Sequence, residues 1–252
     1  MQRYFVSLND ISGEHAVLRG DDARHLTRVL RAGAGEKVIV SDGVSREFLA
    51  EVSGLERDVV LLKLIEALPM NGEPKTAVWI AQSLPKGDKL ETVIQKGTEI
   101  GAAAFIPFIS ARTIVQYDGR KEAKRLERWR KIAKEAAEQA HRSRVPEVRE
   151  TLSWGELTAL AKQVPLSLFC YEKEGGRGLR EALAAASQEG DGGLPPGPIL
   201  VIIGPEGGFT REEAEQAGQA GCFPVSLGRR ILRTETAGIT ALSCIMYETW
   251  EI

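Results

Sequence analysis

The sequence predicts an α/β protein in which a small all-β domain precedes a larger domain with a mainly parallel sheet. Short apolar segments separated by turn residues fill residues 3–67, as is typical of a small β-barrel. From residue 76 onward, apolar strands alternate with amphipathic helices, which favours a parallel sheet covered by helices. The polar, turn-rich segment Pro69–Lys75 separates the two patterns, so we expect domains at residues 1–70 and 74–252.

The composition excludes several classes of protein. With 252 residues and a formal net charge of −2, the chain is not a polycation, so a nucleic-acid surface must be a local patch. The first residues lack the apolar core of a signal peptide and no apolar run could span a bilayer, so we expect no membrane partner. Cys170, Cys222 and Cys244 are isolated and odd in number, which indicates reduced thiols and predicts a cytoplasmic protein. The three cysteines and three histidines show no metal-ligand spacing, so we expect no metal site.

The first domain is expected to contain five short strands and one helix. The strands are Tyr4–Val6, His15–Leu18, Lys37–Ser41, Glu47–Val52 and Val59–Ile65. The helix opens at Asp21-Asp22, and Leu26, Val29 and Leu30 form its apolar stripe. Its other face carries arginines at 24, 28 and 31, which are either a solvated face or a stripe that contacts phosphates.

The second domain is expected to alternate strands and helices. The strands are Thr76–Gln82, Ala103–Ile109, Leu166–Tyr171, Ile199–Ile203 and Phe223–Ser226; the helices follow Asp88 and cover 121–140, 179–186, 211–220 and 235–247. Capping boxes are expected at Asp88 with Glu91 and at Thr210 with Glu213. The helix at 121–140 has a basic face, which is either solvated or an RNA footprint.

Two glycine-bearing segments, Pro198–Thr210 and Val225–Ala237, follow the same design. In each, apolar residues lead to glycine and then to the start of a helix. Loops at the carboxyl ends of neighbouring strands bind small ligands in open α/β sheets. No Lys-Ser/Thr pair follows Gly204–Gly208, so this is not a phosphate-binding P-loop, and no nucleophile elbow is present. Glycines would let the backbone approach a flat ligand, which suits an adenosine group.

Both segments closely resemble the signature segments of the bacterial 16S ribosomal RNA (uracil-N3)-methyltransferase family (RsmE), a member of the SPOUT superfamily. The matching residues are Ile203-Gly-Pro-Glu-Gly-Gly-Phe-Thr210 and Leu227-Gly-Arg-Arg-Ile-Leu-Arg-Thr-Glu-Thr-Ala237. The likeness continues through Lys86-Gly-Asp-Lys89, Gln95-Lys-Gly-Thr-Glu99 and Arg144-Val-Pro-Glu147, and reaches His25–Arg31. It therefore covers essentially the whole chain.

The resemblance implies an N-terminal PUA-like β-barrel that helps to hold RNA and a C-terminal SPOUT-type parallel-sheet domain with a trefoil knot. It also implies S-adenosyl-L-methionine as cofactor, 16S ribosomal RNA or the small ribosomal subunit as partner, and a homodimer with active sites at the subunit interface. The expected reaction is methyl transfer to N3 of a specific uracil. The alternatives are a non-catalytic RNA-binding ribosome assembly factor and a nucleotide-dependent oxidoreductase that uses the loop Gly175–Gly178.

The resemblance also assigns roles to residues. The expected catalytic residues are Arg233, which would stabilise the uracil anion or hold a phosphate, and Glu206, one of two carboxylates near the site. The expected cofactor-binding residues are Ile203, Gly204, Glu206, Gly207, Leu227, Gly228, Ile231, Leu232 and Thr236. The candidates for RNA contact are Arg24, His25, Arg28, Arg31, Lys86, Lys89, Arg112, Arg142 and Arg144. The proton acceptor stays open between Glu206, Glu235, water and a phosphate oxygen, and Arg233 could instead form a structural salt bridge.

Overall fold

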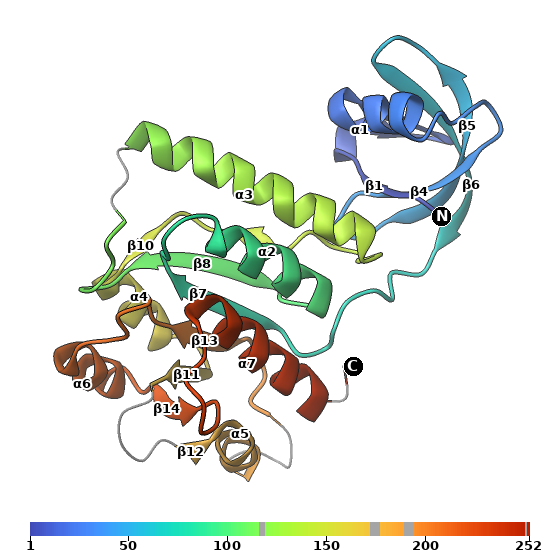
Figure 1. Cartoon of the computed structure of the whole chain (residues 1–252). Helices are drawn as coiled ribbons and strands as arrows, with labels where there is room; N and C mark the ends of the chain where they lie inside the picture. Colours follow the sequence, from blue (N-terminus) through green and yellow to red (C-terminus); the bar gives the residue numbers. More distant parts are fainter. Residues whose placement is uncertain (116–118, 172–176, 189–193, 250) are drawn as a thin grey trace. The chain divides into compact units, whose positions relative to one another are not determined.

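A computed structural model describes residues 1–115, 119–171, 177–188, 194–249 and 251–252 (Figure 1). The chain divides into two compact units, each built from two segments. The first unit comprises Met1–Glu73 and Lys134–Val145, and the second comprises Pro74–Ala133 and Pro146–Ile252. The division adds Lys134–Val145 to the N-terminal unit; the domain boundary expected at residues 70–74 stays a prediction. Among the described helices, none has both the length and the apolar composition needed to cross a membrane.

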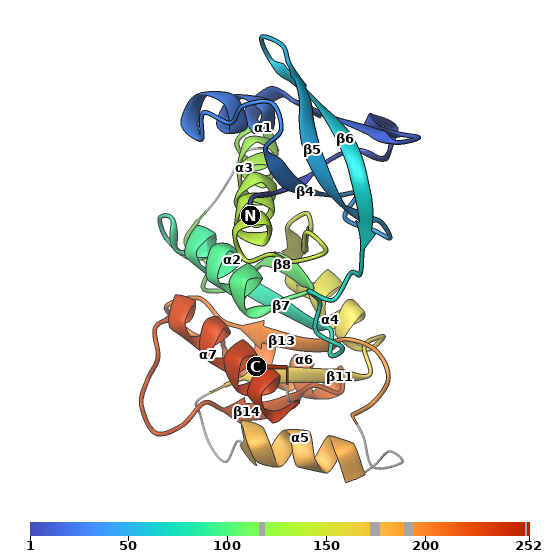
Figure 2. The same ribbon diagram turned by 90° about the vertical axis from the view of Figure 1, so that its right-hand side faces the viewer.

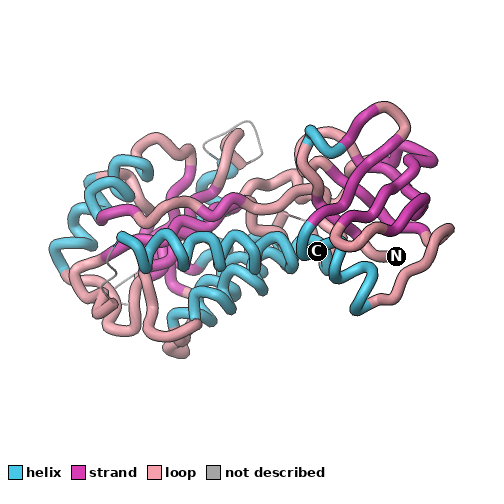
Figure 3. The backbone as a smooth tube through the Cα atoms, turned by 90° about the horizontal axis from the view of Figure 1, so that it is seen from above, coloured by secondary structure: helices cyan, strands magenta, loops and turns pink. Residues whose placement is uncertain are grey.

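The first unit contains one six-stranded sheet that curves around its own core (Figure 3). Its strands are β1 (Arg3–Phe5), β2 (Ile11–Ser12), β3 (His15–Arg19), β4 (Lys37–Ser41), β5 (Glu47–Leu55) and β6 (Val59–Leu68). The order is β1-β4-β5-β6-β3-β2, parallel only between β1 and β4. Two register shifts in the β5–β6 pair bend these long strands. All five predicted strands are present; the short β2 and the single turn η1 (Leu8–Asp10) were not predicted.

The predicted helix of this unit is present but its phase differs from the prediction. It consists of α1 (Gly20–Arg24) and a π-helical segment, η2 (His25–Val29). Leu26 is buried as expected, whereas Val29 is 67% exposed and Leu30 is 43% exposed. A π-helix has more residues per turn than an α-helix, so residues after Leu26 rotate away from the core. The predicted apolar stripe is therefore wrong for Val29 and Leu30.

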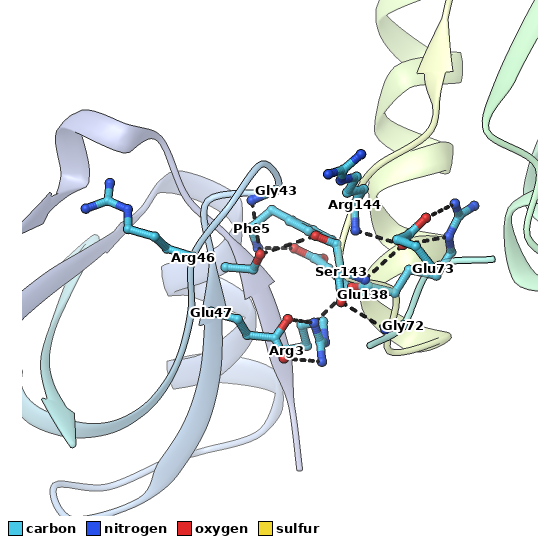
Figure 4. Close-up of polar contacts among 12 residues, drawn as sticks. Arg3, Phe5, Gly43, Arg46, Glu47, Gly72, Glu73, Glu138, Ser143 and Arg144 are labelled. Carbon is cyan, nitrogen blue, oxygen red and sulfur yellow. Dashed lines mark hydrogen bonds and ion pairs between the residues drawn. The ribbon is translucent and has the colours of Figure 1, made fainter. Parts of the chain in front are cut away.

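A polar network joins both segments of the first unit (Figure 4). The Arg3 guanidinium forms a buried ion pair with Glu47 and donates to the Arg142 carbonyl at 2.9 Å. The Glu138 carboxylate accepts the Phe5 backbone N–H at 3.0 Å. Because these groups are buried and paired with one another, they tie Lys134–Val145 to the edge strand β1.

The second unit contains a parallel sheet with helices on both faces (Figures 1 and 2). The strands are β7 (Val78–Ser83), β8 (Ala104–Ile109), β9 (Glu147–Val148), β10 (Leu152–Ser153), β11 (Leu166–Cys170), β12 (Arg177–Gly178), β13 (Ile199–Ile203) and β14 (Phe223–Ser226). The helices are α2 (Lys89–Ile100), α3 (Gly119–Gln139, which ends in the first unit), α4 (Trp154–Ala161), α5 (Leu179–Gln188), α6 (Arg211–Gln219) and α7 (Thr234–Glu248). The α/β fold with a parallel sheet is confirmed.

Alternating side chains of the central strands pack on opposite faces of this sheet. Leu200 and Ile202 of β13 join a cluster with Leu157 of α4 and Ala217 of α6. Ile203 points to the other face, where it approaches Gly238 of α7. Helices α2 and α7 lie next to each other on that face (Figures 1 and 2). Burial on both faces explains why β13 is a continuous apolar run.

The strand order corrects one prediction. The sheet runs β10-β8-β7-β13-β11-β14-β12, so β11 separates the two strands that precede the glycine-bearing loops. These strands were expected to be neighbours. Because every pairing among them is parallel, the carboxyl ends of β7, β13, β11 and β14 nevertheless lie at one edge. The trefoil knot implied by the resemblance stays a prediction.

One of the two predicted capping boxes is present in the structure. The capping box at Thr210 and Glu213 is confirmed. The box predicted at Asp88 and Glu91 is wrong: Asp88 has φ −99° and ψ 16°, outside the extended conformation of an N-cap, and its side chain makes no capping bond. The unpredicted α4 begins with a complete box of Ser153 and Glu156.

Candidate active site

A pocket of about 630 Å³ lies in the second unit, at the carboxyl edge of its sheet. Backbone and side chains from the ends of β11, β13 and β14 line it, together with α2, α7 and the loop after β8. The lining residues are Lys89, Arg112, Cys170, Tyr171, Ile203, Gly204, Pro205, Glu206, Gly207, Gly208, Phe209, Val225, Leu227, Gly228, Arg230, Ile231, Leu232, Arg233, Thr234 and Ala237. A pocket of this volume accommodates a nucleoside-sized ligand.

The glycines let the backbone form the walls of the pocket. A Cβ on Gly204 would lie 2.9 Å from the Phe209 ring, so only glycine fits there without displacing that buried ring. Gly228 has φ +108°, which side-chain-bearing residues rarely adopt, and a Cβ there would meet no protein atom within 4 Å. The backbone at Gly228 therefore faces open space that a ligand could fill.

Two cationic side chains hold the first glycine-bearing loop. Lys89 Nζ lies 2.7 Å from Glu206 Oε1 and 3.7 Å from Glu235 Oε2. The Lys86 backbone N–H also donates to Glu206 Oε1, at 3.2 Å. Arg112 Nη1 donates to the Gly207 carbonyl at 2.7 Å, and its aliphatic carbons would touch a Cβ on Gly207. These contacts connect the loop after β13 to α2 and to the loop after β8.

The environment of Glu206 determines its acidity. Partial burial by itself would raise the pKa of this carboxyl, but hydrogen bonds from Lys89 and from backbone N–H groups outweigh burial and hold the pKa below its ordinary value. The hydrogen bond with Glu206 in turn raises the pKa of Lys89. Both groups are therefore charged near neutral pH.

Arginines follow the second glycine-bearing loop. Arg230 and Arg233 line the pocket and are exposed, and their guanidinium groups form no hydrogen bond or ion pair within the described ranges of the chain. Arg233 is the N-cap residue of α7 and has an extended backbone. It does not form the structural salt bridge to Glu206 or Glu235 that the sequence left open. Its guanidinium is available for an anionic group of a ligand.

The pocket contains no activated sulfur nucleophile. Cys170 is the last residue of β11 and lines the pocket. Burial raises the pKa of its thiol to about 12. A thiol of that pKa stays protonated near neutral pH and is a poor nucleophile. In the part of the chain that the structure describes, no group of three or more His, Cys, Asp or Glu side chains could hold a metal ion.

The structure brings nearly all predicted cofactor-binding residues together. Ile203, Gly204, Glu206, Gly207, Leu227, Gly228, Ile231 and Leu232 line one pocket. Thr236 does not line it and is exposed, whereas the buried Thr234 does. The sequence did not single out Thr234, Cys170 or Tyr171, and the last two enter because β11 lies between β13 and β14.

The candidates for RNA contact divide between the units. Lys86, Lys89 and Arg112 lie in the second unit, near the first glycine-bearing loop; Arg24, His25, Arg28, Arg31, Arg142 and Arg144 lie in the first. Arg24 pairs with Asp21 and approaches Asp58 at 3.8 Å, and Arg28 approaches Asp58 at 3.6 Å.

Two of the first-unit candidates have structural partners. His25 Nδ1 lies 3.1 Å from the Tyr4 hydroxyl, so this imidazole is hydrogen-bonded at the junction of η2 and the sheet. Arg142 is 4% exposed, and its guanidinium pairs with Glu73 at 2.5 Å. Such a buried pair favours a structural role for Arg142 rather than contact with RNA.

Family models match both units and identify the chain as a two-domain RNA methyltransferase. Residues 72–246 match the RNA methyltransferase domain family, and residues 18–65 match the RNA methyltransferase PUA domain family. The PUA identity expected for the N-terminal unit is thereby confirmed.

Relatives narrow the assignment. The chain is 41% identical to ribosomal RNA small subunit methyltransferase E of Bacillus subtilis, over 99% of this chain and 97% of that protein. It therefore belongs to the ribosomal RNA small subunit methyltransferase E family. It is also similar to the structure of the Neisseria gonorrhoeae ribosomal RNA small subunit methyltransferase E bound to S-adenosyl methionine (TM-score 0.83, 30% identity, 98% of each chain). A Legionella pneumophila putative methyltransferase with bound cofactor SAM gives a TM-score of 0.86 at 31% identity, over 98% of this chain and 97% of that one.

Proposed function

We propose that this protein transfers a methyl group from S-adenosyl-L-methionine to N3 of a specific uracil in 16S ribosomal RNA. The observation that carries the proposal is that the two segments of the family resemblance, which residues 211–226 separate in the sequence, form the walls of one nucleoside-sized pocket. The Legionella and Neisseria relatives were both solved with this cofactor. The family assignment replaces the oxidoreductase considered from the sequence; Gly175 and Gly176 of its loop lie outside the described residues.

The pocket residues fit the cofactor. Close backbone approach at Gly204 and Gly228 leaves room for a flat base, and main-chain N–H and C=O groups of both loops can read its edge. Leu227, Ile231 and Leu232 supply apolar surface. Of the nine residues expected to bind the cofactor, eight line the pocket, whereas Thr236 does not and its role stays a prediction.

The cofactor supplies an electrophilic methyl group on a sulfonium. In the reaction the N3–CH3 bond forms, the S–CH3 bond breaks, and the N3 proton leaves, because the imide nitrogen attacks as an anion. Arg233 stabilises the negative charge on the uracil oxygens, since its guanidinium is unpaired within the described residues and lines the pocket. Holding the reactants in line supplies much of the rate enhancement.

Glu206 has a positioning role rather than a basic one. A carboxylate whose pKa is held below its ordinary value binds a proton weakly and is a poor general base near neutral pH. Its pair with Lys89 holds the glycine-bearing loop against α2. The proton then passes to water, to a phosphate oxygen or to Glu235.

RNA is held by the exposed basic side chains near the pocket and by those on α1 and η2. A uracil in a base pair hides N3, so the target is unpaired or flipped out. The acidic partners of Arg24 and Arg28 would be exchanged for phosphates on binding.

The active protein is a cytoplasmic homodimer. A mass measurement in solution would test the dimer, because a homodimer has twice the mass of one chain.

The test is methyl transfer to RNA from a strain that lacks this modification. Purified protein, labelled S-adenosylmethionine and either naked 16S RNA or small subunits are incubated, and nucleosides are analysed by mass spectrometry. We expect N3-methyluridine at one position. Label on another base or on ribose would overturn the assignment to uracil N3. Tight RNA binding with no label in either substrate would instead indicate a non-catalytic assembly factor.

A further inference from the structure

A fully buried amide lies behind the pocket. Gln82, near the end of β7, has 0% exposure and does not line the pocket. Its Nε2 donates to Thr234 Oγ1 at 2.8 Å and to the Ser83 carbonyl at 3.2 Å. Thr234 Oγ1 donates in turn to the Gly204 carbonyl at 2.6 Å. This chain of hydrogen bonds runs from β7 to the first residue of α7 and on to the end of β13, three elements that lie side by side in Figures 1 and 2.

The direction of each bond follows from the chemistry of its partners. The Gly204 carbonyl can only accept, so the single hydroxyl proton of Thr234 is donated to it. The Thr234 oxygen must therefore accept from Gln82, and the Ser83 carbonyl also needs a donor. Both requirements place Nε2 of Gln82 toward Thr234. Donors and acceptors in this chain of hydrogen bonds can therefore be assigned in only one way. The Gln82 amide, the Thr234 hydroxyl and the Gly204 carbonyl are held in a single arrangement.

This arrangement leaves one atom of Gln82 unsatisfied. Its Oε1 is buried and has no hydrogen-bond partner among the residues that the structure describes. A Cβ on Gly238 would approach this oxygen to 3.3 Å, so a glycine in α7 makes room for it. An unpaired buried acceptor destabilises a fold, whereas an apolar side chain of the same shape would fill the space without that penalty. Stability alone therefore does not account for glutamine at this position.

We propose that Gln82 and Thr234 are positioning residues that hold the two glycine-bearing loops in register for the cofactor. Thr234 directly follows Arg233, and Gly204 directly follows β13, so the bond between Thr234 and Gly204 joins the two loops inside the pocket. Gln82 fixes the Thr234 hydroxyl from the adjacent strand β7. The inference rests on the proposed function, because it assumes that the pocket binds S-adenosyl-L-methionine.

The test removes each bond with little change of shape. Thr234→Val replaces the hydroxyl by a methyl group, Gln82→Met removes the amide, and Thr234→Ser keeps the hydroxyl. Affinity for S-adenosylhomocysteine is measured by calorimetry, and kcat and KM are measured with RNA. We expect Thr234→Val and Gln82→Met each to weaken binding roughly tenfold, because each removes two buried hydrogen bonds of modest net strength. Thr234→Ser should stay within about threefold of the wild type.

The double variant separates positioning from independent packing effects. Because the two bonds form one chain, Gln82→Met with Thr234→Val should bind about as weakly as the weaker single variant. Losses that multiply, to roughly a hundredfold, would overturn the proposal. So would single variants with wild-type affinity and turnover. A wild-type protein that binds no S-adenosylhomocysteine would overturn the proposed function itself, which distinguishes the two failures.

A matched control reports on folding. Ser167 of β11 is also buried, and its hydroxyl donates to the Ala161 carbonyl at 3.1 Å, away from the pocket. Ser167→Ala should lower the melting temperature without changing the affinity for S-adenosylhomocysteine. If Thr234→Val does not fold, Thr234→Ala and Gln82→Leu replace the first pair of variants. Equal loss of affinity in Ser167→Ala and Thr234→Val would show a general packing effect and overturn the positioning role.

Discussion

Lys89 at the start of α2 and Glu206 in the loop after β13 form an ion pair at the pocket, with 2.7 Å between Nζ and Oε1. Their side chains are 31% and 35% exposed, so the pair is partly solvated and its contribution to stability is modest. Its larger effect is on charge: it keeps Glu206 ionised and fixes the loop that carries Gly204 and Gly207.

Glu206→Gln tests whether this carboxylate accepts the N3 proton. The amide keeps an oxygen that can accept the Lys86 N–H but cannot act as a base. We expect kcat to fall less than about tenfold and its increase with pH, measured from pH 6 to 9, to keep the wild-type shape. The reason is that the uracil imide, rather than Glu206, loses the proton that limits the rate over this range.

Glu235→Gln is the matched variant, because Glu235 is the other carboxylate near Lys89. A loss of kcat of roughly a hundredfold or more, together with a flat pH profile, would identify the altered carboxylate as the proton acceptor. In Glu206→Gln that result would contradict the positioning role given to Glu206. Equal profiles in both variants would leave water or a phosphate oxygen as the acceptor.

Arg233→Ala should affect the chemical step more than cofactor binding. Removing a positioned cation from a developing anion lowers kcat by roughly 10²–10³-fold. The dissociation constant for S-adenosylhomocysteine should change little, since that ligand lacks the uracil. Single-turnover rates with saturating RNA and calorimetry measure the two quantities. Arg229→Ala is the control, because Arg229 is exposed in the same loop but does not line the pocket. Equal rate losses in both variants would indicate a shared role in RNA binding.

Gly204→Ala should distort the first glycine-bearing loop. The new methyl group would lie 2.9 Å from Phe209, whose ring packs against Phe169 with centroids 4.4 Å apart and is 3% exposed. The ring has little room to move, so we expect a destabilisation of about 1–3 kcal/mol. Affinity for S-adenosylhomocysteine should fall with it.

Gly218→Ala is the control for this substitution. Gly218 lies in α6, and a Cβ there meets no atom within 4 Å. Alanine should stabilise the helix by up to about 1 kcal/mol. Thermal unfolding and calorimetry on both variants give the comparison; wild-type affinity in Gly204→Ala would show that the loop tolerates a side chain.

Local patterns predicted the elements of this fold well. The apolar run Ile199–Ile203 is a strand with the predicted bounds. A continuous apolar run of this length is typical of a parallel strand that is buried on both faces. The box of Ser153 and Glu156 precedes Leu157 in the sequence and could have predicted α4. The stripe at Val29 and Leu30 failed for a different reason, because a π-helical segment changes the period on which the pattern depends.

Local sequence patterns could not predict the long-range contacts of the site. The two glycine-bearing loops could be recognised from their residues, but the position of β11 between their strands could not, because strand order is set by long-range pairing. Gln82 and Thr234 are 152 residues apart, and nothing in either local sequence indicates their contact. The local sequence around Arg142 predicts an exposed cation. In the structure Arg142 is buried and pairs with Glu73, which lies 69 residues earlier.

Asp42 in the first unit provides a prediction of pH-dependent stability. Its Oδ1 accepts the backbone N–H groups of Val44, Ser45 and Arg46 at 2.8, 2.8 and 3.0 Å, and its Oδ2 accepts from Arg46 Nε at 3.0 Å. Burial by itself would raise the pKa of this carboxyl, but these four hydrogen bonds outweigh it and hold the pKa well below its ordinary value.

Asp42→Asn should therefore destabilise the first unit at neutral pH. Hydrogen bonds to a charged acceptor are stronger than those to an amide, so we expect a loss of about 1 kcal/mol at pH 7. A carboxyl with a lowered pKa in the folded state stabilises the fold above its unfolded pKa of about 3.9 and ceases to do so as the pH falls through the folded value. The difference between wild type and variant should therefore be full at pH 7 and shrink below about pH 4.

Denaturant unfolding of both proteins at pH 7, 5, 4 and 3, followed by circular dichroism, measures this difference. If two transitions appear, each transition is fitted separately. Asp10→Asn is the control: Asp10 pairs with Arg19, whose side chain is 61% exposed, so its loss should change stability by less than about 1 kcal/mol. A difference for Asp42→Asn that grows toward low pH would contradict the prediction, because it would mean that the folded state binds the proton more tightly than the unfolded chain does.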